Sequence, residues 1–214
     1  EPVAAPVVVG RRSRRRRRRY GKACEGVDLN VFTRRSTNLT LEDCMSITRQ
    51  LGYKPLNMVE IGARDKEGAP LCILLYPLNF NAELKGRYMS KMLPFPTIYW
   101  IASTSLHKRI SELEDKGWIS KLQSRLDDDE DAQMHMVKAH DQCATERLSM
   151  LSQEDTEAMK NPNCAWQNCL TKVGIAGMKD FKKVKCLHCH LAHYLCRPEH
   201  NNIIGKWVHL ALYL

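Results

Sequence analysis

The stretch that most constrains this chain spans residues 185–196 and reads Lys-Cys-Leu-His-Cys-His-Leu-Ala-His-Tyr-Leu-Cys. It holds three cysteines and three histidines, and neither glycine nor proline interrupts it. Such a run predicts a helix, on which residues at i, i+3, i+7 and i+10 share one face. That face carries Cys186, Cys189, His193 and Cys196.

Sulfur and imidazole on one helix face are compatible with three structures. The four side chains could bind a soft metal such as zinc. In a wider version of this site, Cys164 and Cys169 join Cys186 and Cys189, with His193 or Cys196. They could instead pack as buried thiols, because a free cysteine behaves as a small hydrophobic residue. In the third structure, Cys186 pairs with Cys196 in a disulfide. We favour buried thiols and expect no cofactor, because a Cys-x4-Cys pair and a helical Cys-x2-Cys pair are both unusual for zinc.

A thiol nucleophile is a further alternative, because a nearby imidazole lowers the pKa of a cysteine. On a regular helix, His190 and His193 share the face of Cys186, whereas His188 does not. The sequence shows no acidic partner and no oxyanion motif for such a nucleophile. We therefore predict no catalytic residue, no enzyme activity and no small-molecule substrate.

Positive charge is concentrated in the first 22 residues. Eight arginines and Lys22, opposed only by Glu1, contribute +8 of the chain's net charge of +9. Arginine binds phosphate bidentately and each neutralised phosphate releases counterions, so this segment predicts an extended arm on a polyanion. A targeting-peptide remnant or a localisation signal is the alternative. The predicted RNA-binding residues, with Tyr20 placed to stack on a base, are Arg11, Arg12, Arg14, Arg15, Arg16, Arg17, Arg18, Arg19, Tyr20 and Lys22.

The rest of the composition is ordinary for a soluble protein, with 43% hydrophobic and 27% charged residues. No apolar run reaches the length of about 18 residues that a transmembrane helix needs. Nine cysteines, an odd number in a chain of 214 residues, do not fit a small disulfide scaffold. Reduced thiols point to the cytosol, a mitochondrial matrix or a plastid stroma.

We expect three segments: an arm over residues 1–22, a connecting segment with one helix over 23–53, and a globular domain over 54–214. The helix begins after the capping residue Thr40 and ends at Gly52. Apolar runs at 58–61 and 71–76 flank a polar loop and predict an antiparallel hairpin. A short strand follows Pro96. The side chains expected on the buried face of the first helix are Leu41, Met45, Thr48 and Leu51.

The second half of the chain is expected to be mainly helical. Residues 106–126 predict one amphipathic helix. The acidic run 127–131 is expected to end this helix. We expect the run to be a solvated loop or, as an alternative, a contact for a basic neighbouring protein. Residues 132–160 predict a second helical region, and residues 174–177 a flexible hinge. In that second region the expected inward side chains are Met134, Val137, Cys143, Leu148 and Leu151. The predicted fold class is α+β, with a small antiparallel sheet packed with three or more helices and an extended basic N-terminal arm.

Seven blocks occur in an order and spacing that resemble a known family. They are Glu67-Gly68-Ala69-Pro70, Pro94-Phe95-Pro96-Thr97-Ile98-Tyr99-Trp100, Leu113-Glu114 with Gly117, Arg147, Gly174-Ile175-Ala176-Gly177, Lys185-Cys186-Leu187-His188, and Ala192-His193. Over residues 54–208 the chain resembles the bacterial domain-of-unknown-function family 501. The resemblance supplies no activity.

The chain departs from the family pattern at two positions where that pattern has cysteine. The first falls at Arg64-Asp65, before the Gly-x-Pro loop, and the second near Ser103. In the family those cysteines, with the equivalents of Cys186, His188 and His193, would form a metal or thiol site. Only the C-terminal part of that site is kept here, which argues against retained chemistry.

A bacterial-type domain with an added arginine arm suggests a repurposed organelle protein. We predict a structural RNA-binding protein of a mitochondrial ribosome, located in the matrix, with a plastid as second choice. The arm would hold rRNA phosphates with little base specificity, and the body would contact neighbouring ribosomal proteins. One alternative is an accessory subunit of a mitochondrial respiratory or ATP-synthase membrane complex, with the arm on cardiolipin. Another is a thiol or metal-dependent enzyme descended from the bacterial family.

Overall fold

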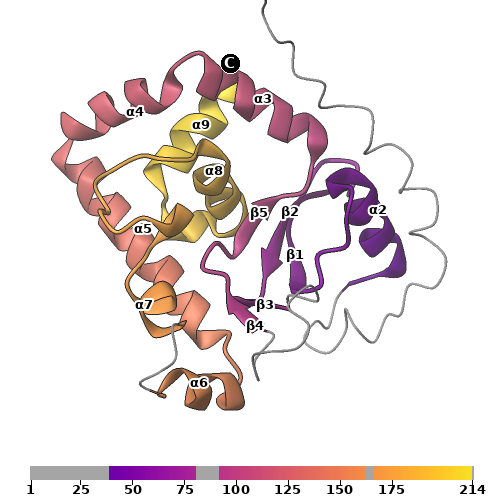
Figure 1. Ribbon diagram of the computed structural model, residues 1–214. Coiled ribbons are helices and arrows are strands. Elements are labelled where there is room, and N and C mark those ends of the chain that lie inside the picture. Colours follow the sequence, from indigo (N-terminus) through magenta and orange to yellow (C-terminus); the bar gives the residue numbers. More distant parts are fainter. Residues whose placement is uncertain (1–38, 81–91, 162–165, 214) are drawn as a thin grey trace, which may run out of the picture.

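The computed structural model describes residues 39–80, 92–161 and 166–213, so the predicted arm, including residues 11–22, lies outside the described residues. Within them the fold is α+β, as predicted, with helices around a small antiparallel sheet (Figure 1). Its three strands have the order β1-β2-β5, and β3 pairs with β4 in a two-stranded sheet. The strands are β1 Met58–Arg64, β2 Pro70–Leu75, β3 Leu78–Phe80, β4 Met92–Pro94 and β5 Tyr99–Ile101.

The predicted hairpin is confirmed. β1 and β2 pair antiparallel from Met58 with Leu75 to Arg64 with Pro70. β2 is the central strand, so side chains that alternate along it enter two different core clusters. Cys72 and Leu74 face the larger cluster, which includes α8 Leu187–Cys196, whereas Ile73 and Leu75 face the cluster that includes α2 Leu41–Leu51.

Helix α2 has the predicted ends but only part of the predicted inward face, because Leu51 packs against the core while Leu41 and Met45 do not. Thr40 and Asp43 form a capping box, and Gly52 ends the helix with a φ of 75°. Leu41 and Met45 are 46% and 38% exposed. Asp43 is buried instead, because both of its carboxylate oxygens accept hydrogen bonds from Arg64 on β1, at 2.7 and 2.9 Å. Cys44 and Ile47 of α2 are also buried, so these side chains and the ion pair together set the rotation of the helix. The Arg64 guanidinium lowers the pKa of Asp43 to about 2.

The single helix predicted over residues 106–126 is two helices, α3 Thr104–Asp115 and α4 Trp118–Asp127. Gly117 lies between them in the left-handed region, with a φ of 76°, and this conformation interrupts the helical path. The acidic run does end α4, and its Asp129 side chain caps α5 Glu130–Ser149. Met134 was expected inward but is 64% exposed, whereas Cys143 is buried as predicted.

Among the described residues after α5, the chain forms three further helices before α9, one of which is α8, along with two short 3-10 turns. The other elements of this part are α6 Gln153–Met159, α7 Trp166–Thr171, the 3-10 turns η2 Ile175–Gly177 and η3 Pro198–His200, and α9 Ile203–Tyr213. The predicted hinge at residues 174–177 is a packed turn instead. A Cβ on Gly174 would clash with the ring of His140, whose Nδ1 accepts a hydrogen bond from Ile175 N at 2.9 Å.

Helix α8 lies at the centre of the fold. It contacts α9, β5, β2 and α3 (Figure 1), and its central residues belong to the larger hydrophobic core. Nearby, the fully buried Arg147 donates hydrogen bonds to the carbonyl oxygens of Leu170, Val173 and Pro96, which ties α5 to the loops around it. Among the described helices, none combines the length and apolar character needed to cross a membrane.

Candidate thiol site at the start of helix α8

Cys186 lies at the boundary between an extended segment and helix α8. It is the N-cap residue, with φ of −118° and ψ of 114°, and its side chain makes no capping hydrogen bond. Glu114 of α3 serves that purpose, because its Oε1 accepts a hydrogen bond from Leu187 N at 2.8 Å. A carboxylate is stabilised at a helix N-terminus by the exposed backbone amides. Glu114 therefore couples the end of α3 to the start of α8.

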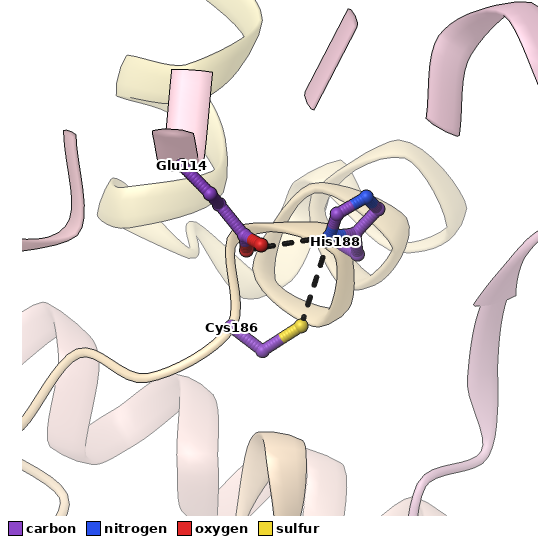
Figure 2. Close-up of side chains that lie close together, drawn as sticks. All are labelled: Glu114, Cys186 and His188. Carbon is purple, nitrogen blue, oxygen red and sulfur yellow. Dashed lines mark hydrogen bonds and ion pairs between the residues drawn. The ribbon is translucent and has the colours of Figure 1, made fainter. Parts of the chain in front are cut away.

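His188 faces both Cys186 and Glu114 (Figure 2). Its Nδ1 lies 3.9 Å from Cys186 Sγ and 3.3 Å from Glu114 Oε1. On the other side of the ring, Nε2 lies 3.1 Å from the carbonyl oxygen of His107 and 3.3 Å from Ser111 Oγ. His107, Ser111 and Glu114 are at i, i+4 and i+7 on α3, so one face of that helix supplies all three contacts.

These contacts favour the doubly protonated imidazolium form of His188. Nε2 must carry a proton to donate to the His107 carbonyl, and Nδ1 faces an anionic carboxylate. Burial alone would lower the pKa of His188, but the hydrogen bond to Cys186 and the charge of Glu114 raise it above its ordinary value. The neighbouring ring of His107, whose centroid is 4.2 Å away, has its pKa lowered by burial and by the charge of His188.

Cys186 is stabilised as a thiolate. The neighbouring thiol of Cys189 and the imidazole of His188 together outweigh burial and lower the pKa of Cys186 well below that of a free thiol. The interaction with Cys186 and burial raise the pKa of Cys189. The thiolate also sits at a helix N-terminus, where negative charge is favoured. The first turn of α8 therefore holds one activated and one protonated sulfur.

A pocket of about 620 Å³ lies beside these sulfurs. Cys186, His188 and Cys189 form part of its wall, and aromatic and aliphatic side chains form most of the rest. Those side chains are Leu51, Tyr53, Phe95, Tyr99, Trp100 and Ile101. Pockets of this size with a few polar groups at one end are typical small-molecule sites. An apolar ligand bound in this pocket would therefore lie beside the Cys186 sulfur.

The same side chains could hold a metal. Ligand atoms of Glu114, Cys186 and His188 all lie within 4.8 Å of one another. One thiolate, one imidazole and one carboxylate form a donor set that Zn²⁺ accepts, and three protein ligands leave a fourth position for water or substrate. The structure of these three side chains is therefore compatible with either a bare ion-paired thiolate or a metal-bound one.

Comparison with known proteins identifies the family. The model of the family described as "Protein of unknown function (DUF501)" matches residues 61–210, which is more than half of the chain. The chain belongs to the DUF501 family. No curated protein and no solved structure matches it. The blocks quoted for the resemblance include Glu114, Cys186 and His188, so the DUF501 region contains all three residues of the site.

The four residues predicted as a metal site do not converge in this DUF501 protein. Cys186 and Cys189 interact with each other. Cys196 instead lies in the same core cluster as Cys72 of β2, and His193 contacts Asn202 and His200, at 3.0 Å each. Cys186 and Cys196 are free thiols and not the disulfide considered as an alternative. The wider zinc site is not formed around Cys169, and Cys164 lies outside the described residues.

The prediction that His188 does not share a face with Cys186 is wrong, and the reason is local. The i, i+4 rule holds only inside a helix, and Cys186 precedes its helix with extended backbone. The acidic partner was missed because Glu114 is 74 residues from His188. A signal was present, since His107, Ser111 and Glu114 are polar residues at helical spacing on a segment with a strong apolar stripe.

The two positions where the family pattern has cysteine serve local structure here. Asp65 accepts hydrogen bonds from the backbone of Glu67 and Ala69, at 3.1 and 2.7 Å, and shapes the β1–β2 loop. Ser103 caps α3 by accepting a hydrogen bond from Leu106 N at 3.3 Å. Asp65 is not in the group formed by Glu114, Cys186 and His188.

Proposed function

We propose that this DUF501 protein acts through Cys186 as a thiolate nucleophile on a ligand held in the adjacent apolar pocket. One observation carries the proposal: Cys186 Sγ contacts the imidazole of His188 at 3.9 Å, and both residues line that pocket. An ion-paired thiolate is the reactive form of cysteine. The sequence offered a Cys186 nucleophile as an alternative but favoured no enzyme activity. The contacts of Cys186 lead us to propose the alternative instead.

Each neighbouring residue has a role in this proposal. His188 keeps Cys186 ionised and can give its Nδ1 proton to a leaving group. Glu114 orients His188 and balances its charge, while the His107 carbonyl and Ser111 hold the other ring nitrogen. The aromatic wall of the pocket selects an electrophile with an apolar or aromatic group, because burying such a surface is favourable.

Alkylation with N-phenylmaleimide tests the proposal. The reduced full-length protein is treated at pH 6, in the presence of a chelator, and each cysteine is followed by peptide mass spectrometry. Cys186 should react about 100-fold faster than Cys169, a half-exposed thiol on α7. Cys169→Ser should leave the fast reaction unchanged, and Cys186→Ser should abolish it. Equal rates at Cys186 and Cys169 would contradict the proposal.

For the whole chain we propose a second function, rRNA binding in a mitochondrial ribosome. It rests on the eight arginines among residues 1–22, a density of positive charge that suits phosphate binding. In this proposal the chain lies in the matrix, the arm holds rRNA and the body contacts neighbouring ribosomal proteins. A plastid location and an arm on the cardiolipin of a membrane complex are the other outcomes that its test distinguishes.

Sedimentation of detergent-solubilised organelles, with and without RNase, tests this second function. The proposal expects the chain to run with ribosomal particles and to shift after RNase treatment. Replacing the arginines at 14–19 by serine should release it, whereas Cys186→Ser should not. Movement with a membrane complex that is insensitive to RNase would refute ribosome binding and support the membrane alternative. The two proposals concern different parts of the chain and stand or fall independently.

A further inference from the structure

The first turn of α8 contains a second thiol that the proposed nucleophile does not itself use. Residues 186–189 read Cys-Leu-His-Cys, so Cys189 follows Cys186 by three positions. The two thiols shift each other's pKa in opposite directions, and both side chains line the pocket. The other thiol pair of this helix, Cys196 with Cys72, is buried and does not line the pocket.

The local geometry allows these two sulfurs to join. Residues three apart on a helix have Cβ atoms about 5–6 Å apart, and a disulfide requires about 3.5–4.5 Å. Cys186 can close this difference because its backbone is extended and its side chain makes no capping hydrogen bond. Glu114 Oε1 already caps α8 through Leu187 N, so the start of the helix does not depend on the Cys186 side chain.

We propose that Cys186 and Cys189 form a redox-active dithiol that reduces a disulfide carrying an apolar or aromatic group in the pocket. The inference rests on the proposed nucleophilic role of Cys186 and adds the substrate class and the second reacting residue. It is carried by the three-residue spacing of the two cysteines at the start of α8, by the imidazole of His188 at 3.9 Å from Cys186 and by the position of both thiols in the pocket wall.

The reaction balances with the groups present. The Cys186 thiolate attacks one sulfur of the substrate disulfide, and the leaving thiolate takes the proton of the His188 imidazolium. Neutral His188 then accepts the proton of Cys189, whose sulfur attacks Cys186 Sγ in the mixed disulfide. The second substrate thiolate leaves and takes that proton in turn. Two electrons pass from the dithiol to the substrate, which becomes two thiols, and a small dithiol reductant returns Cys186 and Cys189 to the starting state.

The aromatic disulfide 4,4'-dithiodipyridine is the probe that tests the dithiol. The reduced full-length protein should show a fast phase that releases two thiopyridone molecules and forms a Cys186–Cys189 disulfide. Trypsin places both residues in the peptide 186–206, and fragmentation assigns the bond. Cys189→Ser should release a single thiopyridone in the fast phase and retain a mixed disulfide on Cys186. Cys169→Ser, at a thiol away from the site, should match the wild type.

The outcomes separate this inference from the proposed function. A wild-type fast phase that ends in a persistent mixed disulfide on Cys186 would overturn the dithiol but leave the nucleophile. A fast phase that joins Cys186 to Cys196 would also overturn it. No fast phase, together with slow alkylation by N-phenylmaleimide, would overturn both. The wild-type peptide map does not depend on a variant, so the inference can be refuted even where Cys189→Ser fails to fold.

Discussion

The two ends of helix α8 carry the same kinds of side chain and behave in opposite ways. At its start, Cys186, His188 and Cys189 are partly exposed and line a pocket. At its end, His193 and Cys196 are buried in the core. The charge states follow this division. The pKa of His188 is raised, whereas burial lowers that of His190, two residues further on, to about 4.

The difference lies in the partners that other elements supply. Glu114 brings a carboxylate to His188, whereas the side chains that bond to the rings of His190 and His193 are Asn202 and His200. Asn202 donates to His190 and His193 at Nδ1, at 3.3 and 3.0 Å, and its Oδ1 accepts from Gly205 N at 2.9 Å. A buried imidazole without a charged partner stays neutral, because desolvation opposes its ionisation. Residue type alone therefore does not separate a reactive cluster from a structural one.

Acid should destabilise the protein through the buried histidines, and this is the largest effect that we expect. Burial lowers the folded-state pKa of His140 to about 3 and of His190 to about 4, and that of His193 well below its usual value. Between pH 6.5 and these values only the unfolded chain binds the protons. The stability that the neutral histidines provide is thus fully present above pH 6.5. As the pH is lowered below 6.5, the free energy of unfolding decreases by up to about 1.4 kcal/mol per pH unit for each histidine.

Urea unfolding at several pH values measures this slope. His190→Gln should make it shallower, whereas replacing the exposed His135 on α5 by glutamine should not. His188 works in the opposite direction, because its raised pKa adds stability below pH 6.5 that is lost as pH rises through the folded value. Equal stability at pH 5 and pH 7.5 would show that the C-terminal end of α8 is not a neutral buried cluster.

Gly205→Ala should disturb the C-terminal end without altering the chemistry of the N-terminal end. A Cβ at this position would clash with the His190 carbonyl oxygen and the Tyr194 side chain, so α9 would have to move away from α8. We expect a loss of about 2–3 kcal/mol in the free energy of unfolding. Thermal and urea unfolding measure it, with the exposed neighbour Lys206→Ala as control. A loss no larger than that of the control would contradict the close contact.

His188→Gln should raise the pH at which Cys186 becomes reactive. Without the imidazolium the thiolate loses its cation, so its pKa rises and the pH profile of alkylation shifts upward. At pH 6 the rate should fall about tenfold for each unit of that shift, and Glu114→Gln should give a smaller decrease in the same direction. His135→Gln is the matched control. An unchanged pH profile in His188→Gln would show that His188 does not control the charge of Cys186.

Cys196→Ser should give the smallest effect on reactivity. Cys196 is a buried thiol that interacts with the thiol of Cys72. Removing this interaction should lower the free energy of unfolding by about 1 kcal/mol, while the rate of Cys186 alkylation stays the same. The alkylation assay and a thermal melt on the same sample measure both quantities. A large decrease in the alkylation rate of Cys186 would show that the two ends of α8 act as one functional site.

Local structure was predictable from sequence, and long-range partners were not. The capping box of Thr40 and Asp43 and the β1–β2 hairpin follow from neighbouring residues, and the structure confirms them. The helix predicted over residues 185–196 is also confirmed, except that it begins at Leu187. The rotation of α2 depends in part on Arg64, which is 21 residues from Asp43. In the same way, the site depends on Glu114. A sequence pattern indicates which residues share a face, but not which distant side chain that face meets.

One peptide allows the most direct test of the account, because trypsin does not cut at Arg197–Pro198 and residues 186–206 therefore carry Cys186, Cys189 and Cys196 together. The native protein is treated briefly at pH 6 with isotopically light iodoacetamide, then unfolded and labelled with the heavy form. The account predicts that Cys186 carries the light label in about 100-fold excess over Cys196. Equal labelling of the two cysteines would contradict the claim that one end of α8 is a reactive site and the other is core.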